Sequence, residues 1–517
     1  MPIRSLFPSF SPTLWAVIGF VLLLVSLSND SIDMDEAQTW DYARLGTFSD
    51  FCHELKNDPN SEAQMPLGMF SFWAWSRAFG TGELAMRSLN LLWAAITLAA
   101  LARAGRQLSI PWLPLLFAIQ PFAWYCMNQA RAPLMQIAGG ALLVAGGIGF
   151  IRREFQDRME GPLLCGGAIL LCGASMLGLL PLTAVVAGLV LHGIWRWDAV
   201  PGFGKILLGV TLGVLGLLGV YYGSTLLRGA GGTRVWSVSP ANMLFVGYEF
   251  LGFQGLGPGR QELRAMMKGV ARSRELLPYV PGFLAFLATY ILLLAASYKS
   301  WMTRGSHTAF IKAGLAETTA RQQQAPPQLS AWLMGVGVTI ASTGLLYGLA
   351  SLVGFPFWGR HLAGAFPFWV LSLAITIHWA RQGLWRVAGR FAAGGLLVLL
   401  LASSLLIRFA PWHEHDDYRG AAAEALRLSA TGHIIWWVAD HSGGAYYGLP
   451  LVDAAADASG KIQFAANRSG TPPVPPGAII ISRPDSFDVS GTAAGLLRSG
   501  GYMRTLRLQA FEVWEKI

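Results

Sequence analysis

The amino-acid sequence predicts a mainly α-helical fold: a polytopic transmembrane bundle followed by a small α/β domain. Composition is the first reason. The 517 residues are 53% hydrophobic and only 13% charged, with a mean hydropathy of +0.45, whereas soluble domains carry about 25% charged residues. Long apolar runs recur from residue 12 to residue 407. Basic residues also alternate between those runs in a regular way.

The apolar runs predict about eleven spanning helices of roughly 17–25 residues each. Their expected ranges are 12–28, 84–103, 111–128, 133–151, 162–178, 180–196, 203–222, 279–298, 330–352, 361–380 and 387–407. Ser26-Leu27-Ser28 is a weak match to a signal-peptide cleavage site. We interpret the first run as a retained anchor, because the loop charges that follow require it.

The loop charges predict the topology. With the N-terminus in the cytoplasm, every cytoplasmic loop carries Lys or Arg, as the positive-inside rule expects. These residues are Arg4, Arg103, Arg106, Arg152, Arg153, Arg158, Arg196, Lys205, Lys299, Arg304, Lys312, Arg321, Arg381 and Arg386. The net charge of +9 is thus a topology signal and indicates no nucleic-acid partner. We expect a plasma (inner) membrane protein whose large outer segments are 29–83, 223–278 and 408–517.

Residues 65–80 are apolar but are not expected to span the membrane. The run is short, begins near Pro66 and is rich in Trp and Phe, which favour the membrane interface. A span here would also move all later basic loops to the outside. We therefore expect a helix that lies flat in the interface.

The composition changes near residue 408, which we take as the boundary between the bundle (1–407) and an extracytoplasmic α/β domain (408–517). Strands are expected at 434–439, 478–482 and 506–515, helices at 418–429 and 491–499, and a proline-rich linker at 472–476. The alternation predicts a partly parallel sheet. For Trp436-Trp437 and Tyr446-Tyr447 we expect core packing, with one Trp facing inward, in preference to a platform for an acceptor sugar.

Several patterns resemble cofactor or metal motifs but favour simpler explanations. Gly255–Arg260 is glycine-rich, yet Pro258 breaks a nucleotide-loop geometry, so we expect a flexible turn or lid. The run 413–417 (His-Glu-His-Asp-Asp) has the two histidines at i, i+2, which favours a solvated cluster at the membrane exit over a metal site. The cysteines, Cys52, Cys126, Cys165 and Cys172, have no metal spacing, and nothing in the sequence supports a Cys52–Cys126 disulfide.

Acidic residues follow the first span directly. Asp33, Asp35 and Glu36 would be costly inside hydrocarbon, so they belong at the surface. A carboxylate there could act as the general base for an acceptor hydroxyl. It could also simply complement the dipole at the start of a helix. The spacing alone leaves both explanations open.

Short motifs add a family context. In chain order they are Asp35-Glu36; Pro66-Leu67 at the start of the flat helix; Phe79-Gly80 with Glu83 and Arg87; Gln129-Ala130-Arg131; Gly359-Arg360-His361-Leu362 with Pro367; and Asp416-Asp417-Tyr418-Arg419. In this order and placement the chain resembles GT-C membrane glycosyltransferases of family 39 type. That family includes the protein O-mannosyltransferases and the lipid A aminoarabinose transferases.

The chain departs from the family pattern at two places. Gln64-Met65 stands where relatives often have His or Lys before Pro-Pro, so a basic contact to the donor phosphate is missing there. Asn128-Gln129 stands where relatives have Glu or Asp, so the second carboxylate of the family's site is absent or displaced. Metal dependence therefore stays open, and the sequence gives no support for a divalent metal as a cofactor.

The resemblance implies a reaction and roles. A sugar would pass from a polyprenyl-phosphate donor to an acceptor hydroxyl on the outer face, with inversion of the anomeric centre. Asp35 would be the general base, and Glu36 would orient it or contact the acceptor. Within the extracytoplasmic context Asp33 is expected to be a solvated bystander. Arg131 and Arg360 would hold the donor phosphate, because guanidinium groups bind phosphate through paired hydrogen bonds.

The remaining expectations concern lipid and partners. Pro66, Leu67 and Trp73 would form the floor of the lipid groove, while Arg260 and Arg264 would contact headgroups. The acceptor would be a glycan, lipid or protein. Two other classes stay open, a transporter or flippase for lipid-linked saccharides and a polysaccharide polymerase or ligase. Transporters favour repeats and charges near the midplane, whereas most charges here lie at the ends of the spans.

Overall fold

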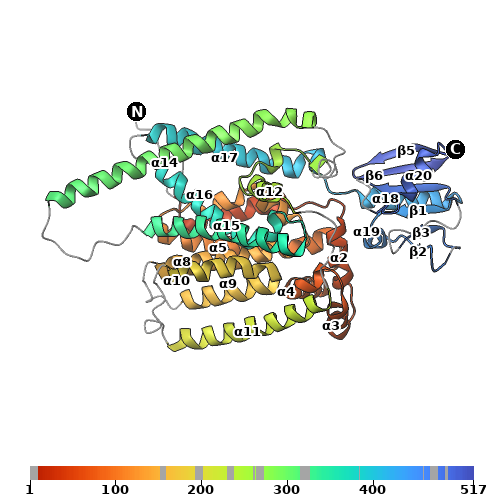
Figure 1. Cartoon of the computed structure of the whole chain (residues 1–517), viewed down its shortest axis with the longest axis horizontal. Helices are drawn as coiled ribbons and strands as arrows, with labels where there is room; N and C mark the ends of the chain where they lie inside the picture. Colours follow the sequence, from red (N-terminus) through yellow and green to blue (C-terminus); the bar gives the residue numbers. More distant parts are fainter. Residues whose placement is uncertain are drawn as a thin grey trace.

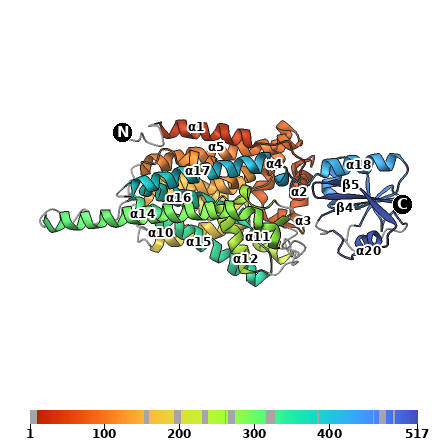
Figure 2. The ribbon, with the colours of Figure 1, turned by 90° about the horizontal axis from the view of Figure 1, so that it is seen from above.

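The computed structural model is a bundle of long helices with a small α/β domain at one end (Figure 1). It describes residues 10–151, 159–191, 202–229, 238–259, 262–263, 273–314, 327–382, 385–457, 459–465, 475–483 and 487–517. The first helix begins at the end of the bundle that lies away from the C-terminal domain (Figure 2). The predicted fold class, a mainly α bundle followed by an α/β domain, is confirmed.

The expected spans are helical. The main helices of the bundle are α1 (Pro12–Ser26), α5 (Glu83–Leu108), α8 (Pro133–Ile151), α9 (Glu160–Ala174), α10 (Leu179–Leu191), α11 (Gly202–Leu227), α14 (Val280–Gly314), α15 (Pro327–Val353), α16 (Phe366–Ala380) and α17 (Arg386–Phe409). Short 3-10 helices, written η, include η2 (Met176–Gly178), η5 (Ser273–Tyr279), η6 (Gly359–Ala365) and η7 (Pro411–His413). Among the described residues, seven helical stretches are long and apolar enough to cross a membrane, and three shorter apolar helices accompany them. The chain is a multi-pass membrane protein.

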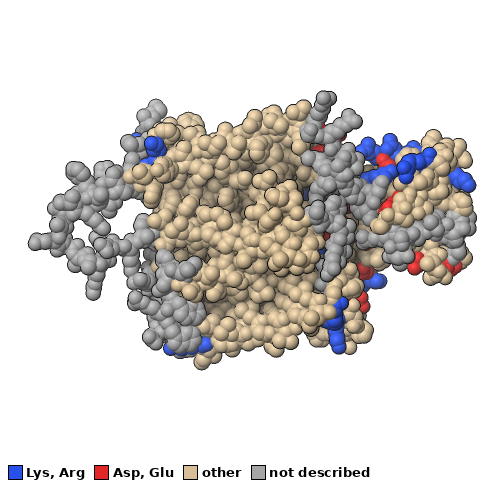
Figure 3. Space-filling model, viewed as in Figure 1, with Lys and Arg blue, Asp and Glu red and all other residues tan. Residues whose placement is uncertain are grey.

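The centre and the edge of the bundle differ in burial. In α8 and in the stretch formed by η6 and α16, 89% of the apolar window is buried, compared with 11% in α11. Helix α8 can lie against η6 because both contribute glycine: a Cβ at Gly140 would lie 2.1 Å from the carbonyl oxygen of Gly364. On the face seen in Figure 3, Lys, Arg, Asp and Glu avoid the middle of the bundle and gather toward its ends and on the C-terminal domain. The exposed apolar belt is the surface expected to face lipid.

The third expected span, 111–128, is not one helix. It forms α6 (Leu113–Ala118) and α7 (Pro121–Met127). Pro121 has no N–H to continue the helical ladder, so the chain breaks before it. Ser404 Oγ on α17 donates to the carbonyl oxygen of Ile119 at 2.9 Å. That bond satisfies a backbone group within the apolar bundle, where water could not do so.

Short helices cover the end of the bundle that faces the C-terminal domain. They are α2 (Met34–Ala43), α3 (Phe48–Asn57), η1 (Ser61–Gln64), α4 (Pro66–Phe79), α12 (Pro240–Phe250) and η4 (Gln254–Leu256). The expected flat helix corresponds to α4, which starts with Pro66 in its first turn and ends at Gly80 with φ 84°. The expected flexible turn at 255–260 is wrong for its described part. Gly255 packs so closely on α17 that a Cβ would lie 1.8 Å from the carbonyl oxygen of Ser403.

The C-terminal domain is a six-stranded sheet with the order β2-β3-β1-β4-β6-β5. Its strands are β1 (Ile435–Val438), β2 (Leu451–Asp453), β3 (Ile462–Phe464), β4 (Ala478–Ser482), β5 (Tyr502–Leu508) and β6 (Phe511–Lys516), with helices α18 (Tyr418–Ala430), α19 (His441–Tyr446) and α20 (Thr492–Arg498). Strands β1 to β4 pair in parallel, and β6 pairs antiparallel with β4 and β5. The partly parallel sheet was expected.

Three details of this domain correct the prediction. The expected strand 506–515 is a hairpin that turns at Ala510, a non-glycine residue with φ 65°. Trp436 and Trp437 are both buried, because both faces of β1 are covered. Tyr446 and Tyr447 do not only pack in the domain core, because their hydroxyls donate hydrogen bonds to Thr81 and Glu83 of the bundle. The four cysteines are free thiols, and residues 472–474 of the proline-rich linker, like Arg260 and Arg264, lie outside the described residues.

Candidate active site

Asp35 lies in the first turn of α2, and the residues on either side of it fix the start of this helix. Asp33 is the N-cap and accepts a hydrogen bond from Glu36 N at 2.9 Å, while Glu36 Oε2 accepts from Asp33 N at 3.0 Å. This reciprocal pair is a capping box, which fixes the direction of a helix from its first residue. Asp33 is therefore 2% exposed, and the expectation that it is a solvated bystander is wrong.

The Asp35 carboxylate forms an ion pair with Arg360, which comes from the other end of the sequence. Both side chains keep some access to solvent, 16% for Asp35 and 24% for Arg360. Arg360 stands in the first turn of η6 and lies over the ring of Trp358, with its Cζ 5.5 Å from the ring centroid. A charged pair that is neither buried nor fully solvated remains reachable by a ligand.

Glu249 holds the start of η6, the helix that carries Arg360. Its Oε2 accepts a hydrogen bond from the backbone N–H of Gly359, the residue that opens η6. Glu249 belongs to α12 and is 3% exposed. A carboxylate at a helix N-terminus is favourable, because the first N–H groups point outward without helical partners. The sequence offered no signal for this contact, since Glu249 lies in a long outer segment far from Gly359.

Arg131 joins the same cluster from the turn between α7 and α8. Its Nη1 donates to the carbonyl oxygen of Asp35 at 2.7 Å and to Glu62 Oε1 at 2.6 Å. Glu62, on η1, is 1% exposed. Burial alone would lower the pKa of the Arg131 guanidinium, but the carboxylate of Glu62 outweighs that effect and raises it. Arg131 therefore carries a permanent positive charge beside Asp35.

Glu62 supplies a second carboxylate where the sequence offered none. At the position where a family acid is missing, Asn128 holds backbone instead. It accepts from Ser28 N at 2.7 Å and donates to the Ser26 carbonyl at 2.7 Å, which joins the end of α1 to α7. The Gln129 side chain donates to the Tyr125 hydroxyl at 2.9 Å. The structure thus brings Asp35, Arg131 and Arg360 into one cluster, with Glu62 as a fourth member that sequence reasoning missed.

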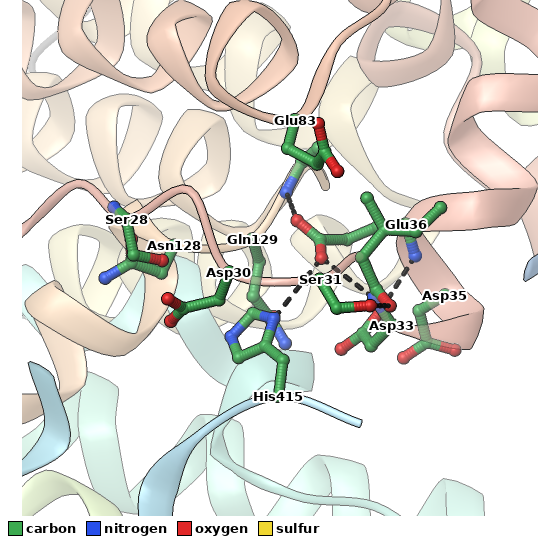
Figure 4. A network of polar contacts seen from close by, with 12 residues as sticks. Ser28, Asp30, Ser31, Asp33, Asp35, Glu36, Glu83, Asn128, Gln129 and His415 are labelled. Carbon is green, nitrogen blue, oxygen red and sulfur yellow. Dashed lines mark hydrogen bonds and ion pairs between the residues drawn. The ribbon is translucent and has the colours of Figure 1, made fainter. Parts of the chain in front are cut away.

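Glu36 belongs to a separate, sealed network (Figure 4). Its side chain is 0% exposed and forms a bidentate pair with Arg87, at 2.8 Å from Nε to Oε1 and 2.7 Å from Nη2 to Oε2. Oε1 also accepts from Ala130 N at 2.8 Å. Burial would raise the pKa of Glu36, but the charge of Arg87 and the hydrogen bonds from His415 and Arg87 hold it below its usual range. The geometry fits the orienting role expected for Glu36 and not a contact with the acceptor.

His415 is part of this sealed network, so the expectation of a solvated cluster at 413–417 is wrong for this residue. It is 8% exposed, with Nδ1 3.4 Å from Glu36 Oε2 and 3.2 Å from Arg87 Nη2. Asp33, Glu36 and His415 place ligand atoms within 4.8 Å of one another, the spacing of a metal site. The Arg87 guanidinium already lies between two of them. The donor set therefore does not fit a cation, because a metal would face that positive charge at contact distance.

The residues expected to floor the lipid groove lie on α4. Pro66 opens the helix directly after η1, which carries Glu62. Leu67 and Trp73 pack on a cluster that includes Met69, and Trp73 Nε1 donates to the Leu45 carbonyl at 2.9 Å. Aromatic rings continue outward from Trp73 to Phe48 and Phe70, which are 55% and 38% exposed. Apolar surface thus lies next to the charged cluster.

Comparisons with known proteins find similarity to solved structures but not to family models or curated sequences. No protein-family model matches the chain, and no curated protein sequence matches it. The structure is similar to a crystal structure of ArnT from Cupriavidus metallidurans bound to undecaprenyl phosphate, with 15% identity, a TM-score of 0.41 and 98% of each chain covered. The apo state of the same protein is 13% identical, with a TM-score of 0.41 and coverage of 98% of this chain and 97% of ArnT.

Proposed function

We propose that the chain is an integral membrane glycosyltransferase that moves a sugar from a polyprenyl-phosphate donor to an acceptor hydroxyl. One observation carries the proposal: at the end of an apolar bundle, the partly exposed Asp35 pairs its carboxylate with Arg360 and accepts a hydrogen bond from Arg131 at its backbone carbonyl. The cluster combines a base with two phosphate ligands, and it lies next to lipid-facing surface. An acceptor glycan, lipid or protein would approach from the side of the C-terminal domain.

The arginines would act on the leaving group. When the bond between the sugar C1 and the phosphate oxygen breaks, negative charge grows on the phosphate, and fixed guanidinium groups stabilise that charge without reorganising. Arg360 pairs with Asp35. A bound phosphate would compete for Arg360 and release the carboxylate. Arg131 keeps its second partner, Glu62, which holds the guanidinium in place.

Asp35 would then act as the general base. The acceptor oxygen attacks C1 from the face opposite the phosphate, the acceptor hydroxyl proton passes to an Asp35 oxygen, and polyprenyl phosphate leaves. One displacement of this kind inverts the anomeric centre. A positioned base contributes about 10²–10⁴-fold to such a step. Glu36, fixed by Arg87, would keep the first turn of α2 in the orientation that the step requires.

The topology supports this assignment. By the positive-inside rule, the basic loops would put the N-terminus in the cytoplasm. The cluster and the C-terminal domain would then lie on the outer face of the inner membrane, where a lipid-linked sugar can serve as donor and a nucleotide sugar is not needed. The α4 helix from Pro66, with Leu67 and Trp73, would floor the groove that receives the prenyl chain.

The test is transfer of a labelled sugar by the purified chain in liposomes, with polyprenyl-phosphate sugar or a nucleotide sugar as donor. We expect a labelled acceptor product and free polyprenyl phosphate from the lipid donor only, and at least a hundredfold lower rate for Asp35→Asn. Asp50→Asn on α3, an exposed acid outside the cluster, is the matched control and should be near wild type. Movement of the lipid-linked sugar across the bilayer without a new bond would overturn the proposal in favour of a flippase.

A further inference from the structure

The segment that joins α1 to α2 is held from two sides. On the bundle side, the fully buried Arg87 donates Nη1 to the carbonyl oxygens of Ser28 at 3.2 Å and Asp30 at 2.9 Å, and Nη2 to that of Ser31 at 3.2 Å. These bonds fix the segment against α5. Because a guanidinium group only donates, Arg87 cannot serve the backbone N–H of Ile32, which needs another partner.

The C-terminal domain supplies the second side. Tyr447, which follows α19, accepts a hydrogen bond from Ile32 N at 3.0 Å through its hydroxyl. The same hydroxyl lies 3.0 Å from Glu83 Oε1, to which it donates. Arg419 of α18 reaches the segment as well, with Nη2 2.9 Å from the Asn29 carbonyl oxygen. A domain more than three hundred residues away in sequence thus contacts the residues that immediately precede α2.

Glu83 connects the two sides. It opens α5, the helix that also carries Arg87, and its Oε1 accepts from both Arg419 Nη2 at 2.8 Å and Tyr447. Farther along α2, Ser442 Oγ donates to Asp41 Oδ2 at 2.6 Å, and the rings of Trp40 and Tyr446 meet edge to face at 5.2 Å. The domain therefore contacts both ends of α2. Ser442 and Tyr446 contact its C-terminal half, and Tyr447 contacts the residue before its N-cap, near Asp35.

The Tyr447 bond matters because of where it falls. Ile32 is 4% exposed, so its N–H would lack a partner if the hydroxyl were removed. Ile32 directly precedes Asp33, the N-cap of α2, and Asp35 follows within the first turn. A shift at Ile32 is passed on to the Asp35 carboxylate, because the capping box makes the first turn a rigid unit. Reaction rates fall steeply when a catalytic group moves by as little as about 1 Å.

We propose that the Tyr447 hydroxyl is a positioning group through which the C-terminal domain sets the orientation of Asp35. The inference rests on the function proposed above. It assigns the domain a part in the chemical step itself, in addition to any contact with the acceptor. Tyr447 touches neither donor nor acceptor in this account, so its loss should lower kcat and leave the KM for the donor unchanged.

The test compares Tyr447→Phe with Tyr502→Phe in the full-length chain. The second change also removes one buried hydroxyl from the same domain, where Tyr502 donates to the Pro476 carbonyl at 2.7 Å away from the bundle. We expect Tyr447→Phe to lower kcat about tenfold with an unchanged donor KM. Hydrogen exchange of the amides in residues 31–36 should also become faster. Tyr502→Phe should retain wild-type kcat and wild-type exchange in that segment.

The outcomes separate this inference from the proposed function. If Asp35→Asn is inactive while Tyr447→Phe turns over like wild type, the positioning role is wrong and the function stands. Equal losses of kcat in Tyr447→Phe and Tyr502→Phe would also overturn it, because the effect would then be general to the domain. If Asp35→Asn transfers sugar at the wild-type rate, the role of Asp35 as general base falls, and the positioning role of Tyr447 falls with it. If the wild-type chain transfers no sugar from the lipid donor, the proposed function itself falls.

Discussion

Asp35 and Glu36 are neighbours on one helical turn, yet they lie in opposite environments. Glu36 is fully buried, with both oxygens engaged by Arg87 and backbone. Asp35 is partly exposed, and its ion-pair partner Arg360 is more exposed still. Successive residues on a helix point about 100° apart, so a single turn can face a sealed interior on one side and a reachable site on the other.

The two environments give the two carboxylates different uses. A buried ion pair costs desolvation and contributes mainly by holding its surroundings in one arrangement. A half-exposed pair can exchange partners with a ligand. The sealed pair of Glu36 and Arg87 fixes the start of α2, the loop before it and the turn at Ala130. In the second group, Asp35 and Arg360 stay reachable by a ligand, and this is the group to which we assign the proposed chemistry.

The largest effect should come from breaking the sealed pair. Glu36→Gln leaves the Arg87 guanidinium buried without its counter-charge, and we expect destabilisation of about 3–5 kcal/mol. Thermal unfolding of the detergent-solubilised protein measures the change. Glu424→Gln is the matched control, since it removes an acid paired with the exposed Arg427 and should cost no more than about 1 kcal/mol. Equal shifts in the two variants would contradict the contrast between sealed and exposed pairs.

The same pair gives a sign for the pH dependence of stability. The pKa of Glu36 is lowered in the folded state, so its contribution is fully present above its ordinary value of 4.5 and is lost as the pH falls below it. We expect the wild type to lose more stability than Glu36→Gln between pH 5 and pH 3. A parallel loss in both proteins would show that Glu36 does not titrate as a buried, paired acid.

A smaller effect is expected from the open cluster. Arg360→Lys keeps the charge but loses the paired donors, so the kcat/KM for the lipid donor should fall about 10–100-fold. The change should leave the melting temperature close to wild type, because Arg360 is 24% exposed. Steady-state transfer at varied donor concentration measures the first quantity. A large loss of stability with intact donor use would place Arg360 among the sealed, structural charges.

The smallest predicted effect concerns the residue behind Arg360. Glu249→Gln keeps an acceptor for the Gly359 N–H but removes the negative charge at the start of η6. We expect donor use to fall about fivefold, the size of one weakened charged hydrogen bond. The donor titration used for Arg360 applies here as well. An increase in donor affinity would instead mean that Glu249 competes with the phosphate for this helix end.

The helices and the cluster of Asp35, Arg131 and Arg360 could be predicted from the sequence because both leave local signals. Apolar length and loop charge predicted the spans, and short motifs singled out Asp35, Arg131 and Arg360. It could not find Glu62 or Glu249 as members of the site, because each acquires its partner only through tertiary contact.

The errors have physical causes too. The acidic neighbours of His415 in the sequence predict a solvated side chain, but in the folded protein it is buried against Arg87. Pro121 signals the break in the third span, but hydropathy alone does not register a missing N–H and so predicts one continuous helix. The hairpin at Ala510 lacks the glycine or asparagine that such turns favour, so the sequence pattern predicts a single strand there.

The most direct measurement is the single-turnover rate of Asp35→Asn with lipid donor bound, made alongside donor affinity and melting temperature. We expect a rate at least a hundredfold below wild type, with donor binding and thermal stability retained. For Glu36→Gln we expect the main loss to be in thermal stability and not in the turnover rate. Wild-type turnover by Asp35→Asn would contradict the central claim that the open carboxylate does the chemistry and the sealed one holds it in place.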